Sequence, residues 1–300
     1  MQKYTTDELI KTVRQYASIP KSSAILSDND IIDLCTNEMH NYLVPEIMSV
    51  REDYFVKFND YNVSDYRDNE SLSIPIPYDA VGSKLRDVAI KQGNQLQPIP
   101  RIFIENLYDS STAFSGYYIE NSDVKIVPYN MNVSTIRMYY IQRPNDLVLS
   151  SRGGTVREVR ENNQIVLSRT PSHFTVGDTI NVIKERQPFN NYKTATILEI
   201  NGTLLTLDDN SNIQAKSWVT SEGESVVPQV PVEAQSVLVQ MGVCKALESM
   251  GDMNGLQIAN EKLVRDLNSM FIYISPRVDS APTKIIPNGY SLSNYNRMGS

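Results

Sequence analysis

The chain has few of the residues that most often form disulfides, metal sites or catalytic centres. Its 300 residues include two cysteines, two histidines and one tryptophan. Cys35 and Cys244 cannot form a disulfide framework, which favours a reducing compartment. No apolar run approaches the roughly 18–20 residues that a membrane span requires, and the first ten residues lack the apolar segment of a signal peptide. We therefore expect a soluble protein of cytoplasmic origin that does not contact a membrane.

Positive charge is also in deficit. Lys and Arg number 28 against 35 Asp and Glu, a formal net charge of −7, and the isoelectric point is near 5.0. A general binder of nucleic-acid backbone needs clustered cations to displace counterions, so that class is disfavoured. Hydrophobic residues at 41% and charged residues at 21% are ordinary for a folded chain. A chain of this length predicts about two domains or one large one.

Two helices are predicted in the first 51 residues. Thr5 and Glu8 fit a capping box, and an apolar helical stripe follows them. A second helix start at residues 27–30 is followed by another apolar stripe. Pro45 is expected to end or kink this second helix at Val44.

Strand signals fill residues 52–150. The prolines of SIPIP are incompatible with a central strand. Three elements are predicted there: a hairpin over 85–104 turning at Gly93-Asn94, a hairpin over 116–129 turning at 121–123, and a strand within 134–149. This segment is therefore interpreted as the first part of a β-rich insertion.

Residues 151–231 contain a more regular strand pattern. Five short segments rich in Val, Ile, Leu and Thr alternate with turn residues: TVREV, NQIVLS, TINVIK, TATILEI and TLLTLDD. Asn201-Gly202, between the last two, is a strong hairpin signal. Five such strands in about 70 residues predict a small barrel or sandwich.

Helical periodicity returns after Pro231. Two apolar stripes separated by the Gly251–Gly255 break predict an αα-hairpin over residues 232–275. Packing this hairpin on the N-terminal helices gives an α+β architecture. The predicted units are a helical core from residues 1–51 and 232–275, the β-rich insertion 52–150, the small barrel or sandwich 151–231, and an extended C-terminal arm 276–300.

The predicted arm has proline-rich, aperiodic sequence but carries apolar and aromatic side chains that a purely solvated tail would lack. At about 3.3 Å per residue it could reach roughly 80 Å. Its candidate docking residues are Pro276, Arg277, Ile285, Ile286, Tyr290 and Tyr295.

The sequence offers little catalytic chemistry. A Ser-His-Asp triad would have to use His40 or His173, and neither accompanies a Gly-x-Ser-x-Gly elbow. Both cysteines lie on apolar helical stripes, which predicts buried packing. The glycines of Gly153-Gly154-Thr155 precede a strand rather than a helix, so we interpret them as a turn rather than a phosphate cradle. No metal motif is present, and we predict no catalytic residue, cofactor or metal.

Two alternatives stay open at this point. The carboxylate pairs Asp208-Asp209 and Glu222/Glu224 lie in predicted turns, where solvation is expected, but a hydrolase could assemble such a pair only in the fold. Seventeen tyrosines against seven phenylalanines suit protein interfaces and carbohydrate surfaces alike. The alternatives are thus an enzyme using turn carboxylates and a receptor- or glycan-binding module.

Three segments within residues 5–105 together resemble a known protein family. They are IPKSSAILSDNDIIDLCTNEMHNYLVPEIMSVREDYFV, SIPIPYDAVGSKLRDVAI and PIPRI. They are similar to head–tail connector proteins, also called adaptor or ring proteins, of short-tailed phages that include the crAss-like phages. A weaker similarity continues in FTVGDTINVIKERQPFNNYKTATILEINGTLLTLDD and in the ISPRV and KIIPNGYSLSN segments of the ending.

This resemblance implies a virion structural protein and not an enzyme. Such connectors have a helical core, form a ring of about twelve copies under the portal vertex, and commonly grip the portal with an extended C-terminal segment. The implied partners are further copies of the chain, the phage portal protein and adjacent neck or tail ring proteins, with genomic DNA passing through the lumen unbound. The implied location is the virion neck, after assembly in the host cytoplasm. The large β insertion departs from the smallest connectors, so the layer of the neck stays open, and a tail or receptor-binding role is the alternative.

Overall fold

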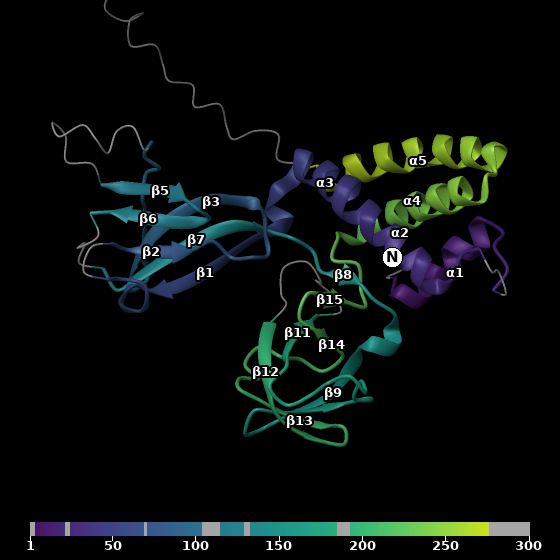
Figure 1. Ribbon diagram of the computed structural model, residues 1–300. Helices are drawn as coiled ribbons and strands as arrows, with labels where there is room; N and C mark the ends of the chain where they lie inside the picture. Colours follow the sequence, from purple (N-terminus) through teal and green to yellow (C-terminus); the bar gives the residue numbers. More distant parts are fainter. Residues whose placement is uncertain are drawn as a thin grey trace, which may run out of the picture.

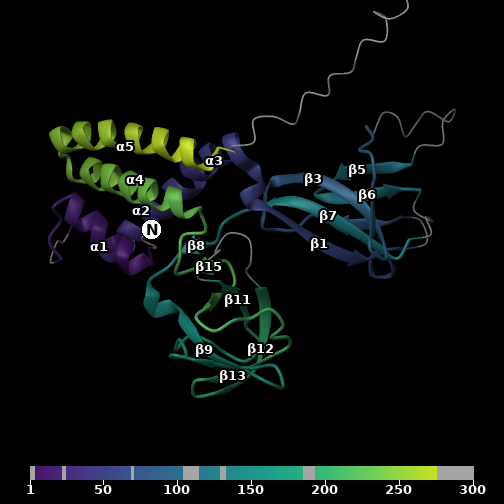
Figure 2. The ribbon, with the colours of Figure 1, turned by 180° about the vertical axis from the view of Figure 1, so that it is seen from behind.

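Three hydrophobic cores organise the chain. The computed structural model describes residues 4–21, 25–68, 71–103, 115–128, 133–184 and 193–275. One core lies among helices, one lies between two small sheets, and one lies inside a closed barrel. Figures 1 and 2 show the helices on one side, the two sheets on the opposite side and the barrel below the junction. The expected mixture of helix and strand is confirmed.

The first helices begin where the sequence predicts. Helix α1 (Thr6–Tyr16) starts with a capping box in which the Thr5 hydroxyl accepts from the Glu8 amide and the Glu8 carboxylate accepts from the Thr5 amide. Helix α2 (Asp28–Glu38) starts with the same arrangement between Ser27 and Asp30. Both boxes satisfy amide groups that a helix start otherwise leaves unpaired.

Pro45 does not end the second helix. A π-helical stretch over Met39–Leu43 leads directly into helix α3 (Val44–Arg51), in which Pro45 occupies the first turn. The Val44 amide donates to the Met39 carbonyl, one residue further back than in an α-helix. Because proline has no amide hydrogen, the wider turn accommodates it without breaking the helical path.

Two long helices complete the helical part. Helix α4 (Val232–Met250) ends at Gly251, whose φ of +75° suits the left-handed position after a helix. Helix α5 (Met253–Ile274) follows with Asp252 as its N-cap. Side chains of α1, α2, α3, α4 and α5 contribute to the same core. At Gly242 of α4 the backbone comes so close to α1 and α2 that an added Cβ would lie 2.6 Å from the Cys35 sulfur.

The segment after α3 forms two facing sheets. A short 3-10 turn (Glu52–Phe55) leads into the first strand. The larger sheet has the order β1-β7-β3-β4 and the smaller one β2-β6-β5, and side chains of both form one core. Their bounds are β1 (Val56–Asn62), β7 (Thr135–Gln142), β3 (Ala80–Gln92), β4 (Gln95–Pro98), β2 (Ser73–Pro75), β6 (Asp123–Val127) and β5 (Gly116–Glu120). The predicted hairpins are β3–β4 and β5–β6, and proline-containing β2 is an edge strand, as its sequence requires.

A six-stranded closed barrel follows, in the order β10-β13-β12-β11-β14-β9. Its strands are β9 (Gly154–Arg160), β10 (Gln164–Leu167), β11 (Thr179–Ile183), β12 (Lys193–Asn201), β13 (Leu204–Leu207) and β14 (Trp218–Ser221). The predicted barrel is confirmed, with one strand more than the five expected. The additional strand β14 pairs with β9 and β11 and so closes the ring of strands. A parallel pair, β8 (Asp146–Leu147) and β15 (Glu224–Ser225), lies between the barrel and the helices.

The predicted arm lies outside the described residues, and with it Pro276, Arg277, Ile285, Ile286, Tyr290 and Tyr295. None of the described helices is long and apolar enough to cross a membrane.

Candidate interaction surfaces

The candidate catalytic residues from the sequence occupy structural positions. His40 lies in the π-helical stretch, and its Nε2 is 3.0 Å from Asp146 Oδ1 of β8. Burial lowers the pKa of His40, while the Asp146 carboxylate opposes this shift. The contact therefore joins the helices to the strand pair beside the barrel. Whether the imidazole in it is neutral or charged depends on pH.

His173 has a serine partner that the sequence did not indicate. Its Nε2 is 3.1 Å from Ser221 Oγ on β14, 48 residues away in sequence. The nearest acid along the chain, Asp178, accepts hydrogen bonds from the Thr175 amide and hydroxyl. No described carboxylate is hydrogen-bonded to His173, so a triad is not assembled at this exposed position.

The sequence predicted that the carboxylate pairs are solvated. In the structure they instead stabilise turns and join neighbouring parts of the fold. Asp208 accepts from the Thr196 amide. Asp209 binds the Lys193 ammonium, which lowers the Asp209 pKa to about 2. Glu222 accepts from the Tyr78 hydroxyl of the two-sheet unit, and Glu224 pairs with Arg152. Each carboxylate thus already has a partner.

The remaining candidate positions serve packing. Both cysteines are buried, and burial raises the pKa of the Cys35 thiol to about 12, which leaves it unreactive at neutral pH. A Cβ at Gly154 would lie 2.4 Å from the Arg169 carbonyl, so this glycine permits a close backbone approach. No cluster of three or more His, Cys, Asp or Glu among the described residues could hold a metal ion.

Helix α5 exposes an unusual amount of apolar surface. Only Ala259, Met270 and Ile274 of its 22 residues are buried. Five large apolar side chains are between 58% and 75% exposed, and together they define what we call the α5 surface: Met253, Ile258, Val264, Ile272 and Tyr273. A groove of about 370 Å³ adjoins it, between the end of α1, α4 and the start of α5. Large apolar side chains exposed along a single helix make it a candidate interaction site.

The larger sheet presents a second candidate surface on its outer side, which we call the sheet face. Phe58 and Tyr139 lie opposite each other on β1 and β7, with ring centroids 5.8 Å apart. The Arg137 guanidinium lies 3.9 Å from the centroid of the Phe58 ring and binds Asp60, which also pairs with Lys91. The hydrogen bonds from Arg137, and to a smaller extent that from Lys91, lower the Asp60 pKa to about 2. Because Arg137 covers the Phe58 ring, a flat ligand cannot stack fully on that ring.

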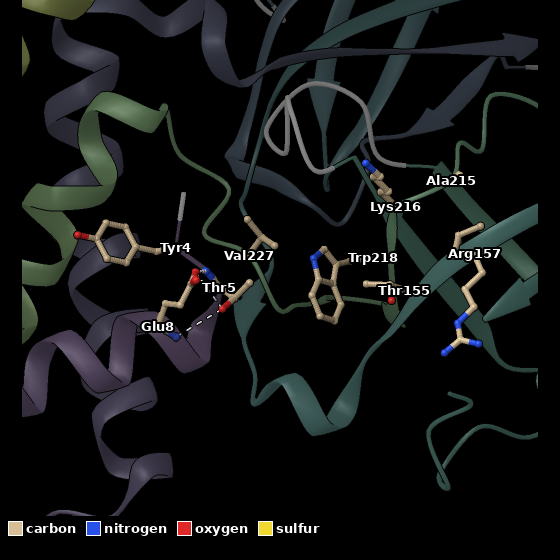
Figure 3. A pocket seen from close by; sticks show the side chains of 10 residues that line it. Tyr4, Thr5, Glu8, Thr155, Arg157, Ala215, Lys216, Trp218 and Val227 are labelled. Atoms are coloured by element: carbon tan, nitrogen blue, oxygen red, sulfur yellow. Dashed lines mark hydrogen bonds between the residues drawn. The ribbon is translucent and has the colours of Figure 1, made fainter. Parts of the chain in front are cut away.

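A pocket of about 550 Å³ lies where α1 meets the barrel. We call it the junction pocket. Its walls come from the start of α1, from β9, from the turn into β14 and from the segment at Val227, and the single tryptophan lies between α1 and β9 (Figure 3). Its lining residues are Tyr4, Thr5, Glu8, Thr155, Val156, Arg157, Ala215, Lys216, Trp218 and Val227. Sequence reasoning missed this pocket, because its walls come from four separate segments of the chain.

No protein-family model and no curated protein matches the sequence. The structural evidence for function therefore consists of the α5 surface, the sheet face and the junction pocket.

Proposed function

We propose that this protein is a head–tail connector, a virion structural protein that forms a ring of about twelve copies in a phage neck. The ring joins the portal vertex to the tail and lets the genome pass. In this proposal the helices from both chain ends, residues 1–51 and 232–275, form the base of the ring subunit, and the two-sheet unit and the barrel project from it to contact neighbouring layers.

The observation that carries the proposal is the α5 surface. Burying an apolar side chain contributes roughly 25 cal/mol per Å² removed from water, before ordering costs. Five such side chains on one exposed helix are a poor arrangement for an isolated monomer and a suitable one for contacts between subunits. In a ring each subunit uses two different surfaces, so α5 would contact a different part of the next copy.

Two further features belong to the proposal. The segment 276–300 would dock on the portal through Pro276, Arg277, Ile285, Ile286, Tyr290 and Tyr295. A net charge of −7 per chain gives about −84 for twelve copies, which would discourage DNA from adhering if the acidic residues line the lumen. Charge reversal of lumen acids without any effect on genome ejection would contradict that last step.

Native mass measurement of the chain mixed with the portal ring from the same genome tests the proposal. Twelve copies of 33.9 kDa would add about 407 kDa. We expect this gain to be lost when residues 276–300 are removed. An intact portal that gains no mass would exclude portal binding.

Substitutions on α5 test the role of its surface. Ile258→Asp and Ile272→Asp place charge at two exposed apolar positions, and we expect each to reduce ring formation while the chain stays folded. Val176→Asp is the matched control, because Val176 is 62% exposed but belongs to the barrel region. Equal loss in all three variants would mean that α5 has no special role in assembly.

The sheet face favours a second candidate, a tail or receptor- and glycan-binding virion protein. Aromatic rings beside carboxylate and guanidinium groups are common in such sites, although the Arg137 contact limits stacking on Phe58. Binding of the whole chain to a glycan array, abolished by Tyr139→Ala, would favour this candidate over the connector.

A further inference from the structure

The junction pocket lies between two parts of the chain with separate cores. On the helical side, the Thr6 amide donates to the Val226 carbonyl at 2.9 Å, and the Tyr4 amide donates to Gln235 Oε1 at 3.1 Å. On the barrel side, Trp218 begins β14 and pairs with Thr155 of β9. The pocket is therefore bounded by elements whose positions hydrogen bonds fix, rather than by loops alone.

The floor of the pocket is apolar. Val156 and Val227 are buried there, and the half-buried Trp218 also lines it. An indole offers a large flat apolar surface with one hydrogen-bond donor. A bulky apolar side chain of a ligand would remove this surface from water, and about 550 Å³ gives room for such a side chain with some backbone.

The barrel wall of the pocket carries two available positive charges. The side chains of Arg157 and Lys216 are exposed, and neither has a hydrogen bond or ion pair with a described residue. Three other basic residues of the barrel region differ: Arg152 pairs with Glu224, Arg160 with Glu158, and Lys193 with Asp209. The two cations at the pocket are thus available for a ligand anion.

Lys216 adopts a backbone conformation that is costly for its residue type. Its φ is +70°, in the left-handed region, and its amide donates to the Val156 carbonyl at 2.7 Å. Residues other than glycine, asparagine and aspartate rarely adopt this conformation. Figure 3 shows the Lys216 side chain on the barrel side of the pocket, with its ammonium directed away from the Trp218 indole.

The acid on the opposite wall is already engaged. Glu8 Oε2 accepts from the Thr5 amide at 2.9 Å and from the Thr5 hydroxyl at 3.3 Å. This carboxylate completes the α1 capping box and has no ion pair with Arg157 or Lys216. The pocket therefore suits a ligand that has an apolar group and that places negative charge near the barrel.

We propose that the junction pocket binds an acidic peptide segment of a partner protein, which inserts a bulky apolar side chain against Trp218 and places carboxylates on Arg157 and Lys216. The pocket residues alone support this proposal, so it does not depend on the connector function. Charged hydrogen bonds between carboxylates and these cations would give specificity, and contact with the indole would give affinity.

Trp218 is the only tryptophan of the chain, so its fluorescence reports directly on the pocket. The probes are three blocked tripeptides, Asp-Phe-Asp, Asn-Phe-Asn and Asp-Ala-Asp, added to the full chain. We expect Asp-Phe-Asp to protect Trp218 from acrylamide quenching, and each of the other two to bind at least about tenfold more weakly. Added salt should weaken the binding of Asp-Phe-Asp.

Charge reversals localise the binding. Lys216→Glu and Arg157→Glu should each weaken Asp-Phe-Asp binding by about tenfold or more. Lys84→Glu, an exposed position on β3 with the same change of net charge, should leave binding unchanged. Circular dichroism of each variant verifies that the fold is retained.

Three results would overturn the proposal. One is that no peptide protects Trp218, and another is that the neutral Asn-Phe-Asn peptide binds as well as the acidic one. The third is that protection appears only after residues 1–3 are removed, which would identify the start of this chain as the occupant. None of these results bears on portal binding, so the two proposals fail independently.

Discussion

The close approach of α4 to the N-terminal helices permits a quantitative test of how the two ends of the chain pack. Gly242 has no side chain, and an added Cβ would lie 2.6 Å from Cys35 Sγ and 3.2 Å from Val13 Cγ2. Cys35 is fully buried on α2. The Gly242→Ala variant therefore places a methyl group directly against a sulfur atom that cannot move into solvent.

Two effects of opposite sign determine the result. Replacing a glycine inside a helix by alanine stabilises the helix by about 0.5–1 kcal/mol. Overpacking a well-filled core costs about 1–3 kcal/mol, so we expect a net loss of roughly 1–2 kcal/mol. Cys35→Ala alone leaves a small cavity and should cost about 1–2 kcal/mol, below the range for larger side chains. In the double variant the new methyl group fills part of that cavity, so the two losses should partly cancel.

Urea unfolding followed by far-UV circular dichroism measures the free energy of unfolding of the four proteins of this cycle. We expect a favourable coupling of about 1–2 kcal/mol between positions 242 and 35. The matched control combines Gly242→Ala with Cys244→Ala. Cys244 also lies on α4, but none of its atoms is among those near an added Cβ at Gly242. If the effects of Gly242→Ala and Cys35→Ala on the free energy of unfolding added to within about 0.5 kcal/mol, the packing of α4 against α2 at this point would be refuted.

Three further predictions follow from buried or paired groups. Thr6 Oγ1 is buried and has no hydrogen-bond partner within the described chain, so Thr6→Val should raise the free energy of unfolding by about 1 kcal/mol; a loss in urea unfolding would contradict this. The Asp60 pKa is lowered from 3.8 to about 2. The ion pairs of Asp60 therefore stabilise the fold fully above about pH 4, and this stabilisation is lost as pH falls from about 4 to below 2. Asp60→Asn should therefore reduce stability at neutral pH, with the difference from the unmodified protein shrinking as pH falls below about 4 and vanishing only below pH 2 in acid unfolding; a constant difference would contradict the pairing. The Cys35 thiol should not react with a thiol reagent at neutral pH until urea unfolds the chain, and rapid labelling of Cys35 in the folded protein would show that it is accessible.

Local signals in the sequence predicted much of the secondary structure. The capping boxes at Thr5 and Ser27 fix helix starts because side chain and backbone satisfy each other within four residues. The β5–β6 turn was predictable for the same reason, since Asn121 and Ser122 both adopt positive φ, which asparagine tolerates. Such features depend only on neighbours in sequence.

Features that depend on distant partners were missed. Strand β14 spans only four residues, which is too short for a clear periodic pattern. It is defined by its pairing with β9, more than 50 residues earlier in the sequence. The π-helical stretch before Pro45 was also missed: the sequence predicted an end or a kink at Val44, and the chain instead continues into α3. The junction pocket belongs to the same category, since Glu8, Arg157 and Trp218 meet only through the tertiary fold.

The two kinds of support for a connector come from different parts of the chain. The resemblance that we infer from the sequence is assigned mainly to residues 5–105, which contain α1, α2, α3 and the start of the two-sheet unit. The α5 surface belongs to residues 253–274, outside that segment, and rests on exposure alone. An accidental similarity in the first segment would not create an exposed apolar helix in the last one, and an apolar helix alone would not specify a phage neck. Loss of assembly in Ile258→Asp and Ile272→Asp, with portal binding by the remaining monomers retained, would separate ring closure from portal attachment and give each part of the chain its own function.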